Sequence, residues 1–287
     1  MRAAQITELR APPEPVDVEG SGSIAVEAVA LNPLDVAVAS GAFYGGHPPL
    51  PYVPGCEAVG RLEDGPLVYL FGDGRGTAKP GFLAERVDVP GELPLRLPEG
   101  VDPALAVAAG IAGIAGWVPV AWRARVTPED RVLVLGATGP VGQVAVQAAA
   151  LLGAEKVVGV GSADLGRVAE EFGTDGFTVC IDPVWGEPLA GMLQYAARRA
   201  RIVHLGQSAG PESPLRSADV RGKELTIMGH SNFVLSKDER DGAYLELLEH
   251  LVAGRIELAV ERYDLDHVAE AWSRQAAGPH AKIVVTL

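Results

Sequence analysis

The second half of the chain alternates short apolar runs with longer stretches of helical character. An apolar run at residues 132–135 leads into a glycine-rich turn, and an Ala- and Val-rich stretch continues to about residue 152. Further strands are predicted at residues 157–160, 177–181, 201–205 and 225–228, with helices at residues 189–199 and 238–252. Gly254 follows the last helix, as glycine often does at helix ends. Strands alternating with helices predict a parallel sheet with right-handed crossovers.

The first 110 residues or so follow a different pattern, β-rich and irregular. Strands are predicted at residues 23–31, 53–62 and 67–71. Prolines are dense from Pro12 to Pro103, which argues against long helices there. Residues 104–125 are rich in Ala and Gly and suit closely packed helices.

The end of the chain carries a strand at about residues 259–263, a helix at about 266–275 and a strand at 282–287. This is the pattern of a chain that returns to its first domain. We therefore expect two domains, one formed by residues 1–112 with 255–287 and the other by residues 113–254.

The composition of the chain argues against several classes of binding partner and cellular location. The formal net charge of −13 argues against nucleic acid and anionic membranes as partners. No uninterrupted apolar stretch reaches transmembrane length, and residues 1–9 lack the apolar core of a signal peptide. With Cys56 and Cys180 as the only cysteines, a disulfide framework is not expected, and the cytoplasm is the simplest location.

The glycine-rich turn after the strand at 132–135 predicts a dinucleotide site. The residues expected to contact the cofactor there are Gly136, Ala137, Thr138, Gly139, Pro140, Val141 and Gly142. A turn of this kind leaves backbone N–H groups free at a helix N-terminus, where a pyrophosphate can bind. The fingerprint G-x-G-x-x-G is imperfect, because Ala137 occupies its first position. The alternative is a plain strand-to-helix turn that binds nothing.

The end of the second strand bears on the choice of nucleotide. NAD sites usually have an Asp or Glu at this place, whereas here Gly161 and Ser162 follow Val160. This favours NADPH, with Arg167 as the nearest cation for a 2′-phosphate. Asp164 favours NADH instead, because its carboxylate would repel a 2′-phosphate. Arg167 is equally well explained as an exposed charge on a helix, so NADH remains an alternative.

Four sequence marks, in order, resemble the medium-chain dehydrogenase/reductase superfamily and, within it, the zinc-free quinone oxidoreductase branch. They are the segments at residues 30–35, 54–60, 136–142 and 269–272 followed by 282–284. The resemblance covers nearly the whole chain. It implies an α/β protein with a GroES-like, β-rich catalytic domain and a Rossmann domain built on a doubly wound parallel sheet.

The resemblance can be tested against the zinc sites of its alcohol-oxidising members. The position of the zinc-binding Cys matches Asn32, that of the His matches Cys56, and the third falls near Ile111. An Asn cannot replace a thiolate and Ile has no ligand atom, so no metal is expected. Two cysteines also cannot supply a four-cysteine structural zinc site. Cys56 is then expected to be a small buried residue. The chain is also shorter than typical members between Leu62 and Phe82, a region that often borders the substrate site in this family.

The same resemblance suggests catalytic residues. Asn32 is expected near the nicotinamide, although it could instead cap the turn at Pro33, and Asp35 is expected to order the same loop. A tyrosine usual in this branch is replaced by Ala37. Tyr44 and Tyr52 remain as aromatic candidates at the substrate site.

Two later strand ends are expected to complete the cofactor site. The candidate residues there are Leu205, Gly206, Gln207, His230 and Ser231. The sequence does not decide whether His230 acts as an acid or base or has no catalytic role. His204 is placed inside a strand and reads more readily as a core histidine.

The function that these expectations favour is zinc-independent hydride transfer from NADPH to a small-molecule substrate, a quinone or an α,β-unsaturated carbonyl. Another zinc-free carbonyl or enoyl reductase, or a zinc-type alcohol dehydrogenase relative, stays open, as does a non-enzymatic NAD(P)H-binding redox sensor. The resemblance also implies a homodimer, formed through the edge strand near residues 225–232.

Overall fold

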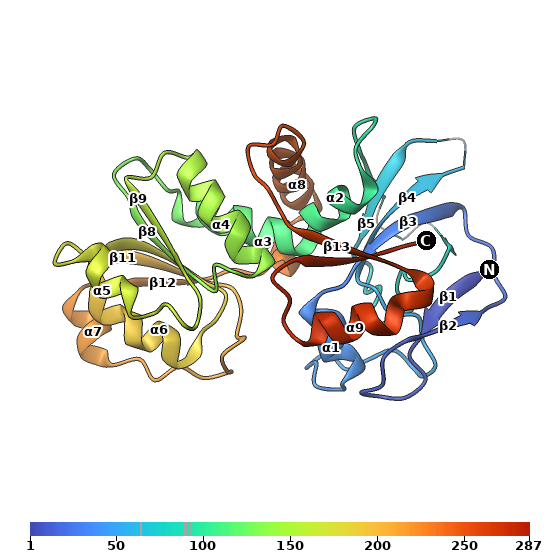
Figure 1. Cartoon of the computed structure of the whole chain (residues 1–287), viewed down its shortest axis with the longest axis horizontal. Helices are drawn as coiled ribbons and strands as arrows, with labels where there is room; N and C mark the ends of the chain where they lie inside the picture. The colour runs from blue at the N-terminus through green and yellow to red at the C-terminus, as the bar shows by residue number, and fades with distance from the viewer. Residues whose placement is uncertain (64, 89–90, 92) are drawn as a thin grey trace. The chain divides into compact units, whose positions relative to one another are not determined.

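The computed structural model describes residues 1–63, 65–88, 91 and 93–287 and divides into two compact units. Unit 1 consists of residues 1–111 and 258–287, and unit 2 of residues 112–257. The N- and C-termini both belong to unit 1 (Figure 1).

Unit 1 is built on a mainly antiparallel sheet. Its strands run in the order β13-β14-β3-β4-β5-β7, and β6 also pairs with β3. Their bounds are β3 Ile24–Ala30, β4 Glu57–Leu62, β5 Leu67–Phe71, β6 Arg86–Val87, β7 Leu95–Arg96, β13 Val260–Asp264 and β14 Lys282–Thr286. The C-terminal strand β14 lies next to β3, with Val285 opposite Val29, so the end of the chain completes the sheet. A separate ribbon pairs β1 Arg2–Gln5 with β2 Glu14–Asp17.

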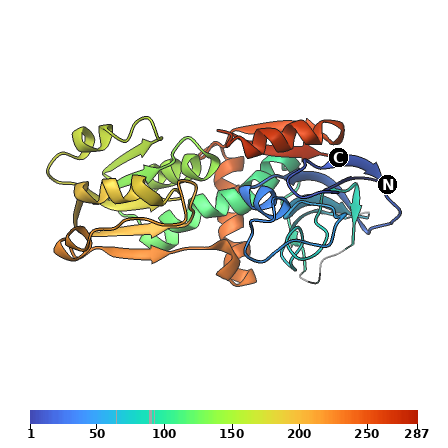
Figure 2. The ribbon, with the colours of Figure 1, turned by 90° about the horizontal axis from the view of Figure 1, so that it is seen from below.

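The helices of unit 1 are short. They are α1 Pro33–Ala39, α2 Pro103–Ala108 and α9 Val268–Ala276. Both α1 and α2 begin with Pro in the first turn, where its missing N–H is not needed. Figures 1 and 2 show α9 near α1. The dense prolines therefore start helices here as well as limiting their length.

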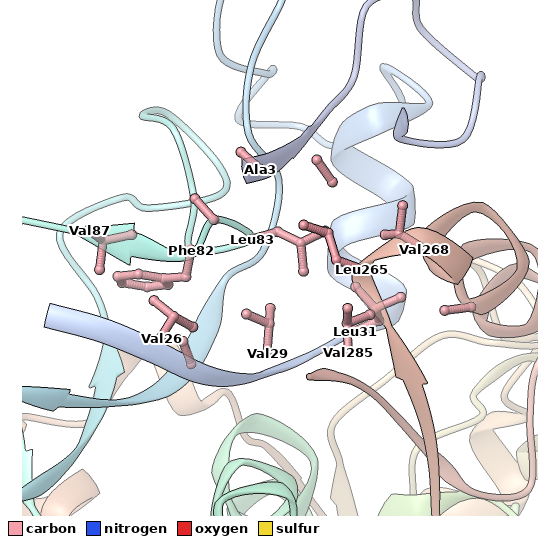
Figure 3. Packing of buried hydrophobic residues seen from close by; sticks show 14 of the residues in the cluster. Ala3, Val26, Val29, Leu31, Phe82, Leu83, Val87, Leu265, Val268 and Val285 are labelled. Atoms are coloured by element: carbon pink, nitrogen blue, oxygen red, sulfur yellow. The ribbon is translucent and has the colours of Figure 1, made fainter. Parts of the chain in front are cut away.

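A core cluster of unit 1 lies between the sheet and the helices α1 and α9 (Figure 3). Val26 and Val29 of β3 and Val285 of β14 contribute from the sheet. Phe82, Leu265 and Val268 pack with them from outside the strands. Apolar residues that are distant along the chain thus share one cluster, which holds residues 258–287 in unit 1.

Unit 2 is a five-stranded parallel sheet with helices on both faces (Figure 1). Its strands are β8 Arg131–Leu135, β9 Lys156–Val160, β10 Phe177–Asp182, β11 Ala196–His204 and β12 Thr226–Gly229, in the order β12-β11-β10-β8-β9. The helices α5 Arg167–Phe172 and α6 Gly186–Met192 pack on one face through Val168 and Leu189. Gly159 of β9 faces the opposite side, where it lies against Val146 of α4 Pro140–Leu151. Covering both faces explains why the strands are nearly continuous apolar runs.

The strand order places the reversal of the sheet at β8. Strands β9 and β10 flank β8 on opposite sides, and both pair with it in parallel. In doubly wound sheets, ligands bind beyond the carboxyl ends of the strands at such a reversal. In the six-stranded form of this sheet, two strands lie beyond the first strand on the side of the second one. Here β8 is the first strand, and among the described strands β9 alone lies beyond it on that side. The glycine-rich turn at the end of β8 therefore lies where the fold favours a ligand.

Two predicted elements were misplaced. The helix predicted at residues 189–199 ends at Met192, a 3₁₀ turn covers Leu193–Tyr195, and β11 begins at Ala196. Pairing with β10 outweighs the helical propensity of this Ala- and Arg-rich segment, since Ala196 lies opposite Phe177. The strand predicted at 53–62 begins only at Glu57, because Pro54 lacks an N–H and Gly55 has φ +105°.

The apolar stretch around residue 110 forms a run of helical segments. In residues 103–124 the structure has one helix long and apolar enough to cross a membrane by length and composition, and 78% of its most apolar window is buried. Gly110 interrupts it with φ −64° and ψ −121°. A buried core helix meets the same test, so the feature carries no membrane assignment.

Helix α8 of unit 2, Lys237–Val252, starts at a capping box formed by Ser236 and Glu239. Helix α7, Ser217–Gly222, precedes the edge strand β12. The predicted helix at residues 238–252 is thus confirmed within one residue.

Candidate functional site: a glycine cradle in unit 2 and a buried polar network in unit 1

We call the turn after β8, residues 136–142, the glycine cradle. Glycines shape this turn at two places. Gly136 has φ +61°, a left-handed conformation that favours glycine. A Cβ on Gly142 would lie 2.3 Å from the carbonyl oxygen of Gly136, so only glycine lets α4 start this close to β8. The turn is therefore held tightly at both ends.

Ala137 replaces the first glycine of the fingerprint without distorting the turn. Its N–H donates to the carbonyl oxygen of Val160 at 3.1 Å. Its methyl group lies 2.7 Å from the position a Cβ would take on Gly159 of β9. The absence of a side chain at Gly159 thus provides the room that the alanine needs.

Gly139 is the open position of the cradle. It is the residue before α4, and the nearest atom to a Cβ built on it, the Gly136 carbonyl oxygen, is 3.6 Å away. Pro140 follows as the first helical residue, and Gln143 Nε2 donates to the Thr138 carbonyl oxygen at 2.8 Å. The first-turn N–H groups of a helix have no intrahelical partners. The Gly139 N–H already donates to the Gly136 carbonyl oxygen at 3.1 Å, and Pro140 has no N–H. The backbone from Thr138 to Val141 therefore offers room for a phosphate group, with Thr138 and Val141 as the donors to it.

The end of β9 is polar and exposed. Gly161 is half-buried, and Ser162 and Asp164 are exposed. The Arg167 guanidinium lies 3.2 Å from a carboxylate oxygen of Glu171, one helical turn on. Arg167 therefore already has an anionic neighbour, and a 2′-phosphate would compete with Glu171 for it.

The ends of β10 and β11 are joined by backbone contacts. The Leu205 N–H donates to the Asp182 carbonyl oxygen at 2.9 Å. A Cβ on Gly206 would lie 2.6 Å from the Pro183 carbonyl oxygen, so the two loops approach closely. Gln207 is exposed beyond them. These predicted cofactor residues lie at the carboxyl edge of the sheet, as expected.

His204 is not in the middle of a strand, as the sequence suggested. It is the last residue of β11, its side chain is 27% exposed, and its Nδ1 lies 3.1 Å from Asp182 Oδ2. It stands at the ligand edge because β11 ends one residue earlier than predicted.

His230 and Ser231 follow β12 at the same edge. His230 Nε2 lies 3.0 Å from Asn232 Oδ1, and the Ser231 hydroxyl accepts the N–H of Phe233. Burial is the main cause that lowers the pKa of His230 below its usual value. The imidazole is therefore neutral at pH 7, which suits a hydrogen-bonding role better than that of a charged acid.

In unit 1, Asn32 belongs to a buried polar network. Its Nδ2 donates to Glu57 Oε1 at 2.9 Å and to the Ala30 carbonyl oxygen at 3.2 Å. Its Oδ1 accepts from Lys282 Nζ, which also donates to the Leu31 carbonyl oxygen at 2.9 Å. The amide is thus fully engaged on both sides and cannot rotate without losing contacts.

Glu57 is the centre of this network and is fully buried. Its Oε2 accepts the Tyr69 hydroxyl at 2.9 Å and the Ile111 N–H at 2.7 Å, and its Oε1 lies 3.4 Å from Lys282 Nζ. Lys282 is also buried, and burial lowers its pKa against the opposing effect of Glu57. Each charge therefore compensates the other inside the fold.

Asp35 organises the start of α1 rather than facing outwards. Its Oδ2 accepts the N–H of Asn32 at 2.8 Å and its Oδ1 accepts the N–H of Cys56 at 2.9 Å. Burial raises the pKa of Asp35, and hydrogen bonds from the Cys56 side chain and the Asn32 N–H oppose the rise. The expected loop-ordering contact of Asp35 is therefore seen in its geometry.

The two candidate tyrosines differ in environment. Tyr44 is 95% exposed and lies 4.5 Å from the Phe43 ring, centroid to centroid. Tyr52 is buried in the unit 1 core, and its hydroxyl has no partner among the residues that the structure describes. Burial raises the pKa of Tyr52, which makes it a poor acid. The four candidates therefore do not form one constellation, since Tyr44 lies apart from the buried three.

The donor set around Asn32 does not suit a divalent metal ion. Within the described part of the chain, no three His, Cys, Asp or Glu side chains are grouped as they would be to hold one. Cys56 is buried, and burial beside Asp35 raises the pKa of its thiol well above the usual value, which opposes the thiolate a metal needs. The Lys282 ammonium would also repel a cation at this place.

Sequence reasoning missed the two ionisable residues that dominate the network. Glu57 entered the sequence analysis only within the segment at residues 54–60, and Lys282 only within the one at 282–284. Each lies in or beside an apolar strand run, which is the signal that could have suggested a buried pair.

Comparison with known proteins places this architecture. The chain is 25% identical to the human quinone oxidoreductase over 303 residues, covering 95% of the chain and 91% of that protein. It superposes with a TM-score of 0.80 and 26% identity on the quinone oxidoreductase of Thermus thermophilus, over the full length of both, and that enzyme was solved with NADPH.

A third relative is much longer. The chain is 27% identical to a phenolphthiocerol/phthiocerol polyketide synthase of Mycobacterium tuberculosis over 92% of its own length, but spans only 13% of that protein. No protein-family model matches the chain.

An antiparallel β-rich unit joined to a doubly wound parallel unit with a glycine cradle defines a two-domain α/β class, GroES-like and Rossmann-like. The chain is similar over nearly its whole length to members of the medium-chain dehydrogenase/reductase superfamily, which supports the resemblance expected from the sequence. The fold class and the family expected from the sequence are thereby confirmed.

Proposed function

We propose that the protein is an NADPH-dependent oxidoreductase that transfers hydride, without zinc, to a small-molecule quinone or α,β-unsaturated carbonyl. The observation that carries the proposal is the cradle around Gly139, tight at Gly136 and Gly142 and open where a pyrophosphate would pass. Similarity to two quinone oxidoreductases, one solved with NADPH, supports the cofactor and the reaction class.

The end of β9 supports NADPH over NADH in part. No carboxylate stands at Gly161 or Ser162, where an NAD site would hold the ribose hydroxyls. Ser162 is exposed and can hydrogen-bond a phosphate. Arg167 can contribute charge if it leaves Glu171.

The bound cofactor supplies the hydride, and the chain supplies positions and hydrogen bonds. The backbone from Thr138 to Val141 would hold the pyrophosphate. Asn32 and Asp35 are proposed as positioning residues of unit 1, since every polar atom of their side chains has a partner. With Tyr44 in solvent and Tyr52 in the core, neither is a good proton donor, so we assign the proton to water.

Zinc independence is supported by chemistry at Asn32 and Cys56. The amide is a weak ligand, the thiol is held in its protonated form, and a buried ammonium lies beside them. Stoichiometric, tightly bound zinc in the purified protein would contradict this part of the proposal and favour the alcohol dehydrogenase alternative.

The primary test is calorimetric titration of the full chain with NADPH and NADH, followed by turnover with panels of quinones, enones and aldehydes. NADPH binding tighter than NADH, with consumption of NADPH on a quinone or enone, is the expected result. Turnover only with other carbonyls would favour the carbonyl reductase alternative. Binding without any turnover would favour a redox sensor, and no binding of either nucleotide would refute the proposal.

The cradle offers a sharper test in Gly139→Ala. A methyl group fits the fold, since the nearest atom is 3.6 Å away and φ is −80°, but it occupies the space of the pyrophosphate. We expect NADPH affinity to fall by tenfold or more and stability by at most about 1 kcal/mol, the usual difference between Gly and Ala at a helix cap. Gly191→Ala in α6 is the matched control, because a Cβ there meets nothing within 4 Å. Equal NADPH affinity in the two variants would remove the cradle from the cofactor site.

We further propose a cytoplasmic location, which two buried, unpaired cysteines support. We also propose that the protein is a homodimer.

A further inference from the structure

Three side chains form a cluster at the carboxyl ends of β10 and β11 that the proposed function has not used. Asp182 is fully buried, and its Oδ2 lies 3.1 Å from Nδ1 of the partly exposed His204. The His204 ring lies against the indole of Trp185, with 4.0 Å between centroids and 36° between planes. The cluster thus presents two aromatic rings above one buried carboxylate.

Trp185 is held in a costly backbone conformation. Its φ of 62° and ψ of −158° fall in a region that is populated almost only by glycine. Asp182 Oδ1 accepts the N–H groups of Val184 at 2.9 Å and Trp185 at 2.8 Å, and so fixes the loop. One carboxylate therefore orients both rings, the indole through the backbone and the imidazole directly.

The loop that carries Trp185 adjoins the glycine cradle. A Cβ on Gly136 would lie 3.1 Å from Val184 and 3.4 Å from Pro183. The loop is also tied to the end of β11, because the Ala209 N–H donates to the Val184 carbonyl oxygen at 2.9 Å. The cluster is part of the edge at which the sheet reverses.

The strand order decides which half of a dinucleotide would meet the cluster. In this fold the adenosine ribose is held at the end of the second strand, here β9, and the pyrophosphate at the turn after the first, here β8. Strands β10 and β11 lie on the opposite side of β8 from β9. The nicotinamide half therefore extends towards β10 and β11.

We infer that Trp185 and His204 bind the nicotinamide mononucleotide half of the cofactor, with Asp182 as the residue that positions both. The inference rests on the proposed dinucleotide function. Trp185 supplies an apolar ring face beside the ring and ribose. The Nδ1–H of His204 donates to Asp182, which leaves Nε2 for a ribose hydroxyl. A hydroxyl can donate or accept, so the contact forms with a neutral or a charged imidazole.

The test compares two ligands, NADPH and 2′,5′-ADP, which lacks the nicotinamide half. Aromatic contact contributes to the binding of a base, so Trp185→Leu should weaken NADPH binding about tenfold or more and leave 2′,5′-ADP binding unchanged. Trp185→Phe should recover most of the loss. His204→Asn, which can still donate to Asp182 but lacks Nε2, should weaken NADPH binding several-fold and spare 2′,5′-ADP.

The chain provides a matched control in Trp117 and His250, a second ring pair in unit 2 with centroids 5.0 Å apart. Trp117→Phe should leave both affinities unchanged. Tryptophan fluorescence gives a second readout, because Trp185 is one of four tryptophans and its loss should remove most of the quenching by NADPH.

The possible results distinguish a failure of the proposed NADPH-dependent function from a failure of the assignment of Trp185 and His204. Failure of the wild-type chain to bind NADPH would overturn the proposed function. Wild-type binding that Trp185→Leu and His204→Asn leave unchanged would overturn only the inference. Equal losses for NADPH and 2′,5′-ADP would overturn the assignment to the nicotinamide half.

Discussion

At the scale of single residues, the buried pair of Lys282 and Glu57 has the largest consequence for unit 1. Both side chains are at most 2% exposed, and each has other hydrogen bonds besides the ion pair. Such a pair adds little over apolar residues of equal size, but removing one partner leaves a charge without compensation. The pair therefore makes β3, β4 and β14 depend on one another.

Replacing the lysine should show this dependence. Lys282→Met should destabilise unit 1 by about 3–5 kcal/mol, because the Glu57 carboxylate stays buried without its cation. The double variant Glu57→Gln, Lys282→Met should recover part of that loss, since it removes the orphaned charge. Urea unfolding followed by circular dichroism measures both. A double variant that is less stable than Lys282→Met alone would show that the network acts through its hydrogen bonds and not through charge.

The candidate residues show how far sequence reasoning reaches at this scale. Asn32 was assigned either to the site or to the turn at Pro33, and it precedes α1 while its amide joins Glu57 and Lys282. The sequence could not choose, because Glu57 and Lys282 are 25 and 250 residues away. Tyr44 and Tyr52 looked alike in sequence, but only packing distinguishes the exposed ring from the buried one.

At the scale of elements, Asp130, the residue before β8, links that strand to β10 and β11. Its carboxylate accepts the Thr127 N–H at 2.9 Å and the Thr178 hydroxyl of β10 at 2.8 Å, and it pairs with Arg201 of β11. Burial acts to raise the pKa of Asp130, but these partners outweigh it and hold the pKa below 3.8. This carboxylate fixes the strand ends opposite the ligand edge.

The pKa of Asp130 predicts a pH dependence. Because it is lower in the folded chain than in the unfolded one, its contribution to stability is complete above the ordinary value of 3.8 and is lost as the pH falls below it. Asp130→Asn should cost about 2–4 kcal/mol at pH 7, and its difference from wild type should shrink below pH 3.8. Denaturation at several pH values tests this, with the exposed neighbour changed in Glu129→Gln as the control. A difference that is constant with pH would refute the role of the charge.

Elements defined by local chemistry were predictable. The turn from residue 136 to 142 follows from its glycines, and α8 from its helical pattern and the glycine after it. The helix predicted at 189–199 failed because its second half is held by β10, a contact that local propensity does not contain. The pairing of Ala137 with Gly159 is equally invisible in sequence, although it explains the imperfect fingerprint.

At the scale of the whole molecule, the two-unit α/β organisation follows from the alternating patterns, but the order of strands does not. Sequence gives five strands in unit 2 without saying that β10 lies beside β8 and leaves β9 at the edge. That order is set by crossovers and packing. The strand order decides where the ligand edge lies. It also makes β12 the outer strand of the sheet on the side away from β9.

The exposed outer strand β12 favours the formation of a homodimer. This strand pairs only with β11 in the sheet order of the described residues, and Phe233 and Val234, shortly after it, are 56% and 79% exposed. An unpaired strand edge beside exposed apolar side chains favours pairing with a second copy. Light scattering at micromolar concentration should give twice the mass of 29.9 kDa, and Ile227→Pro should shift it towards the monomer. A wild-type mass of one chain would refute the dimer.

The return of residues 258–287 to unit 1 sets an order of events on the ribosome. Unit 2 is continuous in sequence and can complete its contacts as soon as it has emerged. Unit 1 must wait, since β3 lacks its neighbour β14, and Glu57 lacks its cation, until residues 282–286 are made. Residues 1–111 therefore lack the strands β13 and β14 while residues 112–257 are being made, and we expect them to be most exposed to chaperones and to aggregation during that time.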